Sequence, residues 1–436
     1  MGDATVTSKL GFHIQRPEYP DWLKAHVARS KARVVKIMDP DHGEAKPFGD
    51  VFYIGRLYWG GEPDKQLIRY GAEGAKRWYD GAAPRMAQAP WVHLWELPNE
   101  PDVTSEHACI HLATFTSEAV RIMHDNGLAV GALCLSTGNP PDLSYWQILG
   151  SCLGHADALI LHEYGMRTMT LDGWHLLRYR KAMQELAKHG YRVPPIYITE
   201  TGIDYAGGPD TDGWRAQGIS AEQYRDQLAA YDAELVKDPE VVATTPFTWQ
   251  DYNWPSFAID EHMSGLLADY MAERNQHEVH IPIVTPQPQR RYPALVETVL
   301  PGARLSQGFG QNPGLYAEYG LDGHNGIDLA SPDVGRYMLW HGTQVHAYRA
   351  GRMVVGHSDG YGTYAYVYSE TEDWLYAHLA DATESRDVRA GDVLGWVGYS
   401  GNVIPPDARG THLHLGVRPR PYRLDNGYRG YVDPLA

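Results

Sequence analysis

Residues 195–202 read PIYITETG, an apolar, β-branched run that ends in a carboxylate and a glycine. Comparable runs occupy 9–15 (KLGFHIQ), 32–39 (ARVVKIMD), 50–59 (DVFYIGRLYW), 91–100 (WVHLWELPNE), 127–136 (GLAVGALCLS), 157–165 (DALILHEYG) and 241–250 (VVATTPFTWQ). Segments of helical character separate them, so one strand and one helix take roughly 30 to 35 residues. This spacing predicts a (β/α)8 TIM barrel over residues 1–275. A doubly wound open sheet is the alternative, although no glycine-rich phosphate loop follows the first run.

The sequence changes character after residue 275. Residues 276–300 are rich in proline and charge, and the prolines of TPQPQ (285–289) favour an extended linker. Residues 301–436 contain short alternating runs separated by glycines, among them GTYAYVYSE (362–370) and THLHLGVRP (411–419). This pattern predicts a second, mostly antiparallel β domain.

Bulk composition narrows the classes of partner. The net charge of -16 argues against a nucleic-acid partner, because phosphate backbones require clustered Lys and Arg. No apolar run approaches the roughly 18 residues that a membrane span requires. The first residues, MGDATVTSKLGF, lack the pattern of a signal peptide. We therefore expect synthesis in the cytoplasm and no transmembrane segment.

Two short motifs in the second domain suggest a metal site. In THLHLG (411–416), His412 and His414 are two apart, so an extended strand presents both on one face. Upstream, GLDGHNGIDLASP (320–332) contains His324 and Asp328. A flat strand would hold these two about 13 Å apart, so binding one ion requires the chain to bend beside its glycines.

His324, Asp328 and one histidine of THLHLG would form a His2Asp site with an open fourth position. Such sites are typical of catalytic rather than structural zinc. The second histidine of THLHLG and His378, in LYAHL (375–379), could then transfer protons.

Residues 306–419 resemble the lysostaphin-type (LytM-like) zinc metallopeptidases, which cleave peptide bonds of bacterial cell walls. The matching stretches, in order, are HNGID, GTQVHAYRAGRMV, LYAHL, VRAGDVLGWVGYSGN and THLHLGV. The resemblance implies that His324, Asp328 and His414 bind Zn²⁺, while His412 and His378 flank the attacking water and the scissile carbonyl. Two departures concern the substrate groove: the insertion DVGRYMLWH (333–341), and Leu415-Gly416 in place of an aromatic and acidic pair.

The predicted barrel carries its own candidate site. Glu100 and Glu200 end the fourth and seventh strands, on the face where barrel enzymes hold their catalytic groups. Carboxylates about 5 to 5.5 Å apart suit a retaining glycosidase. Residues 9–270 are similar to clan A glycoside hydrolases, and the similarity implies that Asn99 contacts the sugar 2-hydroxyl, Glu100 is the acid/base and Glu200 the nucleophile.

Four further residues at strand ends are predicted to contact substrate. Arg56 could orient a carboxylate through two hydrogen bonds. His162 and Tyr164 end the sixth strand, and Trp249, after the eighth, could stack on a sugar ring.

Together the two domains suggest a monomeric, bifunctional peptidoglycan hydrolase. Because no signal peptide is recognised, release resembling that of a phage endolysin, or packaging as a virion-associated lysin, would bring it to the cell wall. One alternative is a zinc endopeptidase whose inactive barrel only binds cell-wall glycan. Another is a non-catalytic amidase activator, although activators of this type typically lack the metal ligands that are present in this sequence.

Overall fold

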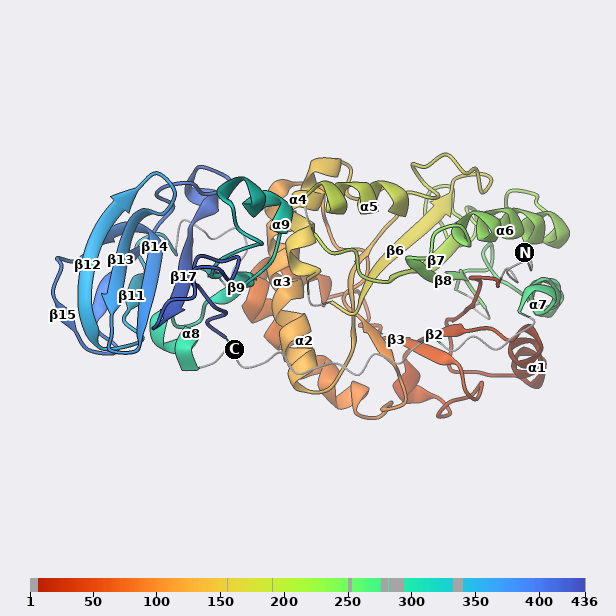
Figure 1. The fold of residues 1–436 in the computed structure, drawn as a ribbon. Coiled ribbons are helices and arrows are strands. Elements are labelled where there is room, and N and C mark those ends of the chain that lie inside the picture. Colours follow the sequence, from red (N-terminus) through yellow and green to blue (C-terminus); the bar gives the residue numbers. More distant parts are fainter. Residues whose placement is uncertain are drawn as a thin grey trace. The chain divides into compact units, whose positions relative to one another are not determined.

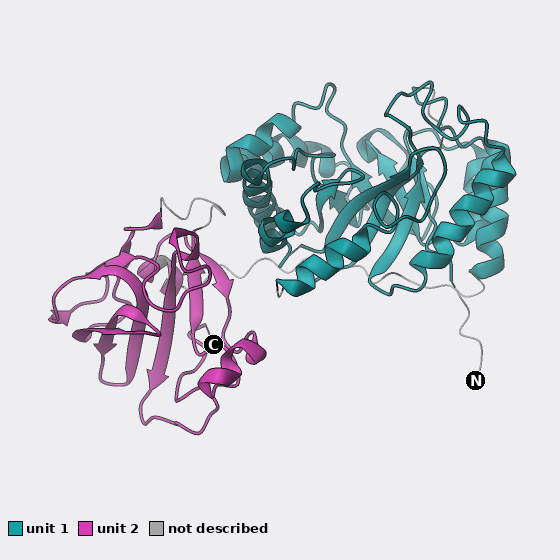
Figure 2. Cartoon of the chain, turned by 90° about the horizontal axis from the view of Figure 1, so that it is seen from above, with its two compact units in different colours: residues 1–288 teal, residues 289–436 magenta. Residues whose placement is uncertain are grey.

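The computed structural model describes residues 7–154, 156–189, 191–249, 253–275, 281, 294–331 and 340–435. The chain divides into two compact units, residues 1–288 and 289–436 (Figure 2). Within the described ranges, no helix combines the length and the apolar character needed to cross a membrane.

The first unit contains an eight-stranded parallel sheet whose strands follow chain order (Figure 1). The strands are β1 (Phe12–Ile14), β2 (Val34–Met38), β3 (Phe52–Arg56), β4 (Leu94–Glu96), β5 (Val130–Leu135), β6 (Ala158–Gly165), β7 (Ile196–Ile203) and β8 (Val241–Pro246). Gly11 N donates to Thr244 O over 2.8 Å and Trp249 N donates to His13 O over 2.9 Å, so the end of the sheet returns to its start. Every predicted run contains one strand, which confirms the barrel.

Helices alternate with these strands. They are α1 (Asp21–Ser30), α2 (Gly71–Met86), α3 (Glu106–Asp125), α4 (Trp146–Leu149), α5 (Tyr179–Lys188), α6 (Ala221–Leu235) and α7 (Glu261–Arg274). Side-chain caps define several starts: Ser105 accepts from Ala108 N at α3, and Ser220 forms a capping box with Gln223 at α6. Between β2 and β3 only a short 3₁₀ helix occurs, at Pro40–His42.

The second unit contains a nine-stranded sheet in which all pairings between strands are antiparallel (Figure 1). Its strands are β9 (Arg304–Gln307), β10 (Ile327–Ala330), β11 (Gln344–His346), β12 (Gly351–Ser358), β13 (Gly362–Tyr368), β14 (Glu372–Ala382), β15 (Asp387–Val388), β16 (Val393–Val397) and β17 (His412–Pro419). The main path runs β15-β12-β13-β14-β17-β10-β9, while β11 and β16 pair together and β16 also pairs with β14. The predicted antiparallel domain is confirmed.

The two faces of this sheet differ in character. Because side chains alternate along a strand, Leu413 and Leu415 enter the apolar core while His412 and His414 lie on the opposite face. In the register of β10 with β17, Asp328 is directly opposite His414. Pairing of these two strands therefore brings together the two halves of the predicted metal motif.

Most of the predicted linker, 276–300, and most of the insertion 333–341 lie outside the described residues. The end of that linker forms α8 (Ala294–Val299), and Leu295, Val296 and Leu300 are buried in the core of the second unit. Apolar burial thus makes this segment part of the second unit, which begins before residue 301.

Truncation of Leu300 tests whether this segment supports the second unit. Leu300→Ala in the full chain should lower the free energy of unfolding of the second unit by about 2 to 5 kcal/mol, because it removes a buried side chain. Leu315→Ala, at a side chain 47% exposed in the same unit, should change it by less than about 0.5 kcal/mol. Hydrogen exchange under denaturant, resolved by peptide, measures both; unchanged protection of residues 301–435 in Leu300→Ala would contradict the assignment.

Candidate functional sites

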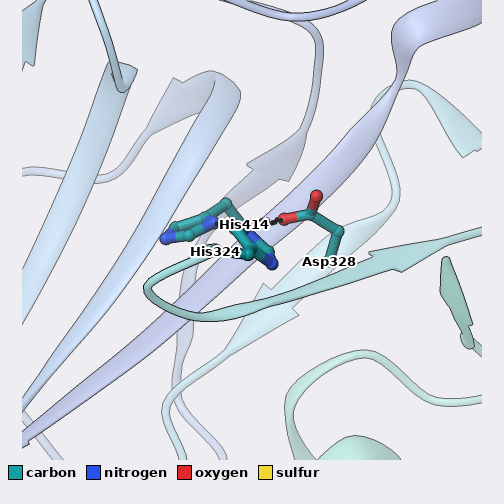
Figure 3. A group of neighbouring side chains, drawn as sticks. All are labelled: His324, Asp328 and His414. Atoms are coloured by element: carbon teal, nitrogen blue, oxygen red, sulfur yellow. Dashed lines mark hydrogen bonds and ion pairs between the residues drawn. The ribbon is translucent and has the colours of Figure 1, made fainter. Parts of the chain in front are cut away.

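Three side chains of the second unit converge on one point (Figure 3). His324 precedes β10, Asp328 lies on β10 and His414 lies on β17. His324 Nε2 is 2.9 Å from His414 Nδ1 and 3.2 Å from Asp328 Oδ1, and His414 Nδ1 is 3.1 Å from the same oxygen. A tetrahedral site with bonds of 2.0 to 2.1 Å places neighbouring ligand atoms about 3.3 to 3.4 Å apart. The three separations are each within about 0.5 Å of these edges, so the cluster is compatible with a zinc site.

Hydrogen bonding alone does not account for this triangle. In the neutral His324 ring, Nδ1 donates to Gly308 O over 3.2 Å, and Nε2 then carries a lone pair that faces Asp328 and His414. At least one of the three short contacts then brings two lone pairs together. A cation at the centre removes that repulsion, and the bond to Gly308 orients the ligand ring as metal sites require.

Burial and charge have opposite effects on the carboxylate. Burial would raise the pKa of Asp328, but the neighbouring His324 and His412 rings hold it well below its usual range. Burial lowers the pKa of His414. Both shifts favour the protonation states that bind metal, a carboxylate and a neutral imidazole.

Glycine makes the close approach of the ligands possible. A Cβ added at Gly326 would lie 2.6 Å from Leu415 O and 2.7 Å from Cε1 of His414. The predicted bend between His324 and Asp328 thus occurs at a position where only glycine leaves room for the ligand ring.

Two more histidines border the metal triangle. His412 Nε2 is 3.8 Å from Asp328 Oδ1, and the His412 and His378 ring centroids are 4.7 Å apart. His412 Nδ1 donates to Gly410 O over 2.7 Å and His378 Nδ1 donates to Ser400 O over 2.8 Å. In the neutral rings both Nε2 atoms therefore carry a lone pair. Burial, together with the His412 and His414 rings, lowers the pKa of His378 to about 3.

His378 and a tyrosine show how the surroundings fix these rings. His378 has φ +62°, in the left-handed region, at an irregularity where β14 pairs with β13. The Tyr361 ring lies 5.6 Å from that of His414, and its hydroxyl accepts from Asn325 Nδ2 over 2.9 Å. Tyr361 is not among the predicted site residues, because nothing in its spacing connects it to the metal motif.

The barrel brings its predicted carboxylates together as well. One oxygen each of Glu100 and Glu200, with a nitrogen of His162, lie within 4.8 Å of one another. His162 Nδ1 is 2.9 Å from Glu100 Oε1 and 3.6 Å from Glu200 Oε2. Glu100 has φ +44°, a strained conformation of the kind found at functional positions.

Glu200 is surrounded by donors. Lys36 Nζ and Arg56 Nη1 lie 3.0 and 3.1 Å from its Oε1, and the Tyr164 hydroxyl donates to Oε2 over 3.0 Å. Burial would raise its pKa, but His162, Lys36 and Arg56 hold the pKa of Glu200 well below its usual range. An ionised carboxylate at the mouth of the barrel is suited to nucleophilic attack.

The same donors argue against a metal ion in the barrel. Glu100, His162 and Glu200 are close enough to be ligands of one ion. Lys36 and Arg56, however, already neutralise Glu200 and would repel a cation bound beside it.

Three interior residues of the barrel were missed from the sequence. Lys36 is fully buried and bridges Glu200 to Glu96, whose Oε2 is 3.0 Å away. Next to it on β1, His13 is fully buried, with no hydrogen-bond partner for either ring nitrogen among the described residues. The available signal was a lysine within the apolar run VVKIM, because a central charge there must be paired.

The remaining barrel predictions differ in outcome. The Oδ1 atom of Asn99 is buried without a partner among the described residues, so it is available to a ligand. Trp249 is 1% exposed, packs on Phe12, and donates from Nε1 to Ser264 of α7. Its proposed role as a sugar-stacking platform is therefore wrong, because the ring is buried against β1 and a helix of the barrel.

Substitution of Gly326 should weaken metal binding without removing a ligand. Gly326→Ala should lower zinc affinity by at least about 10-fold, because the new methyl group displaces the His414 ring. Gly314→Ala is the matched control, since an added Cβ there meets nothing within 4 Å. Competition with a chromogenic chelator measures both; equal affinities for the two variants would contradict the steric argument.

Comparison with known proteins finds a family similar to part of the second unit. Residues 322–429 match Peptidase family M23. A search of curated proteins finds no match. Among solved structures, the catalytic domain of the prophage-encoded M23 protein EnpA from Enterococcus faecalis is 26% identical, over 30% of this chain and 88% of that chain, with a TM-score of 0.22.

Two further structures are similar over a comparable share of this chain. The catalytic domain of the antimicrobial peptidase lysostaphin from Staphylococcus simulans is 23% identical over 30% of this chain and 89% of that chain, with a TM-score of 0.23. A zinc-containing peptidase from Vibrio cholerae is 24% identical over 26% of this chain and 30% of that chain, with a TM-score of 0.20. Residues 322–429 are thus similar to peptidases of family M23, which depend on zinc, and they contain a His-Asp-His cluster compatible with zinc binding.

Proposed function

We propose that the chain is a bifunctional peptidoglycan hydrolase. Its second unit acts as a zinc endopeptidase on peptide cross-links, and its barrel acts as a retaining glycosidase on the glycan. The triangle of His324, Asp328 and His414 beside two histidines with free Nε2 atoms carries the proposal. An activator without catalysis would not need this complete set of ligands and bases.

In the proposed peptidase reaction, His324 Nε2, Asp328 Oδ1 and His414 Nδ1 hold the metal. When bound there, zinc supplies a Lewis acid that polarises the scissile carbonyl and makes a water molecule more acidic. Nε2 of His412 accepts the proton from the water. The ring centroids of His412 and His378 are 4.7 Å apart. A ring that has gained a proton can then stabilise the oxyanion or protonate the leaving amine.

In the proposed glycosidase reaction, Glu200 attacks the anomeric carbon and Glu100 protonates the leaving oxygen. Their carboxylate oxygens within 4.8 Å suit the retaining arrangement, in which no water fits between the two groups. Lys36, Arg56 and Tyr164 keep Glu200 ionised and oriented, and His162 bonds to Glu100. Asn99 is assigned to the sugar 2-hydroxyl.

We also propose that the protein acts as a monomer on the bacterial wall, either as a phage endolysin or as a virion-associated lysin. Each candidate site is complete within one chain, and one polymer, peptidoglycan, contains both bonds. The second candidate function is a barrel that only binds glycan. The contacts of Lys36, Arg56 and Tyr164 with Glu200 suit a sugar-binding groove as well as they suit catalysis.

Substitution of the zinc-domain histidines separates metal binding from proton transfer. With purified peptidoglycan as substrate, His414→Ala should lose both zinc and peptide cleavage. His412→Ala should retain zinc but cleave about 10²- to 10⁴-fold more slowly, because only the proton acceptor is removed. Mass spectrometry of released peptides and metal analysis measure the two effects. Zinc and cleavage both retained in His414→Ala would overturn the ligand assignment.

Substitution of the barrel carboxylate tests the second activity. Glu200→Gln should form no new reducing ends but should still release peptide termini. A chelator added to the wild type should stop the release of peptide termini and leave the formation of reducing ends unchanged. Glu222→Gln, at a side chain 56% exposed on α6, is the matched control. A wild-type protein that yields peptide termini but no reducing ends would identify the barrel as a binding module.

A further inference from the structure

Histidine rings of the described residues contact one another in two places. One is the metal triangle of the second unit, together with its two neighbouring histidines. The other is on α3 of the barrel, where the ring centroids of His107 and His111 are 4.3 Å apart. Neither of these two residues takes part in the peptidase or glycosidase reaction proposed above, so their approach requires a separate account.

The helix places the two rings on one face. His107 and His111 are four positions apart, and side chains with this spacing lie one turn above one another. The Ser105 side chain accepts from Ala108 N and fixes the start of α3, so both histidines lie in its first two turns. The His107 ring is exposed and the His111 ring is partly exposed. The pair is thus reachable from solvent.

The distance between the two rings is close to that between two ligands of one metal ion. His107 Nε2 and His111 Nε2 are 3.1 Å apart. Neighbouring nitrogens of a tetrahedral zinc site with bonds of 2.0 to 2.1 Å are about 3.3 to 3.4 Å apart. Two histidines four positions apart on one helix face are also the zinc ligands of the H-E-x-x-H motif. The pair therefore has both the spacing and the separation of a chelating site.

A hydrogen bond between the rings is the competing state. When both rings are neutral, one Nε2 donates to the other. A cation bound by both nitrogens replaces this bond, and the exposed His107 ring carries its proton at Nδ1 instead, by exchange with solvent. Both states need the same close approach of the rings, so the helix has already brought them together before an ion arrives.

Charge at the start of α3 also suits a cation. The first turn of a helix carries a partial positive charge, which repels cations. Two acids oppose it: Glu106 is in the first turn of α3, and Asp102 precedes the helix. Burial, with smaller contributions from Asp102 and Glu106, raises the pKa of the Cys109 thiol to about 12. Both carboxylates therefore act on this part of the helix, and Cys109 remains a buried thiol that does not compete as a ligand.

The two imidazoles restrict the kind of ion. Imidazole nitrogen suits Zn²⁺, Cu²⁺ and Ni²⁺, whereas Mg²⁺ and Ca²⁺ require oxygen ligands. Water would fill the remaining coordination positions, because the His107 ring is exposed. Two protein ligands also predict weaker binding than the three ligands of the second unit.

We propose that His107 and His111 form a second metal site, which binds a divalent ion of the Zn²⁺ class on the surface of the barrel. The bound ion connects the first two turns of α3, the helix that follows the loop containing Asn99 and Glu100. It stabilises the folded first unit, because an unfolded chain does not hold the two rings at this distance. The site depends on neither of the proposed activities.

Equilibrium dialysis of the full chain against increasing Zn²⁺ tests the site. The wild type should bind a second, weaker equivalent of zinc in addition to the one in the second unit, and Mg²⁺ should not compete for it. His107→Gln and His111→Gln should each weaken this second equivalent by at least about 10-fold, because removing a ligand costs no less than removing a group that orients one. His262→Gln, at a side chain 65% exposed on α7, is the matched control and should bind as wild type.

A variant of the other metal centre keeps the two sites apart. His414→Ala should lose the tighter equivalent and retain the weaker one, and the combination with His107→Gln should lose both. No second equivalent in the wild type would overturn the proposal. A second equivalent that binds equally well to His107→Gln would be an adventitious ion only, and would overturn it too.

Hydrogen exchange provides a readout that does not count ions. Saturating Zn²⁺ should slow amide exchange in peptides from the start of α3, residues 106–115, because the ion connects its first two turns. Peptides from α6, residues 221–235, should exchange as before. His107→Gln should show no slowing, and since this side chain is exposed the variant should fold as wild type. Exchange at the start of α3 that zinc leaves unchanged in the wild type would contradict the connection between the turns.

Discussion

The pairing of β10 with β17 is the constraint on which the second unit depends. It sets Asp328 opposite His414 and Leu329 opposite Leu413, so one register fixes the metal ligands and the apolar core at once. A slip of one residue would move every side chain of a strand to the other face. Burial of the leucines therefore enforces the geometry of the ligands, and the free energy that folds the sheet also preorganises the site.

In the barrel, ion pairs rather than strand register position the predicted catalytic carboxylates. Parallel strands end at one rim, so carboxylates from β4 and β7 meet there with cations from β2 and β3. Lys36 is fully buried between Glu96 and Glu200, and its removal would leave Glu96 without this ion pair and would take from Glu200 one of its two cationic partners, the other being Arg56. The interior charges are thus mutually dependent, and the ionised state of Glu200 is a property of the whole cluster.

Sequence patterns predicted more of the fold than of the sites. Eight apolar runs gave eight strands because parallel strands are buried on both faces and read as continuous apolar segments. The convergence of His324, Asp328 and His414 was also predictable, since strand alternation places His414 on one face with its neighbour His412. Contacts across the barrel could not be predicted. Lys36 contacts Glu200, which lies 164 positions away in the sequence. Trp249 donates to Ser264 of α7, although its position at a strand end suggested the mouth of the barrel. The 3₁₀ helix in place of a helix after β2 likewise depends on packing that no local pattern shows.

The contact between Gly416 and Tyr431 has a consequence for evolution. A Cβ at position 416 would lie 2.8 Å from the Tyr431 ring, so a larger residue there requires this ring to move. A lineage that places a larger residue after the last metal ligand must first lose or move this tyrosine, and with it one of the rings that hold Arg418. Glycine at this position, which can be read from a sequence alone, therefore indicates whether a related protein has room for the Tyr431 ring.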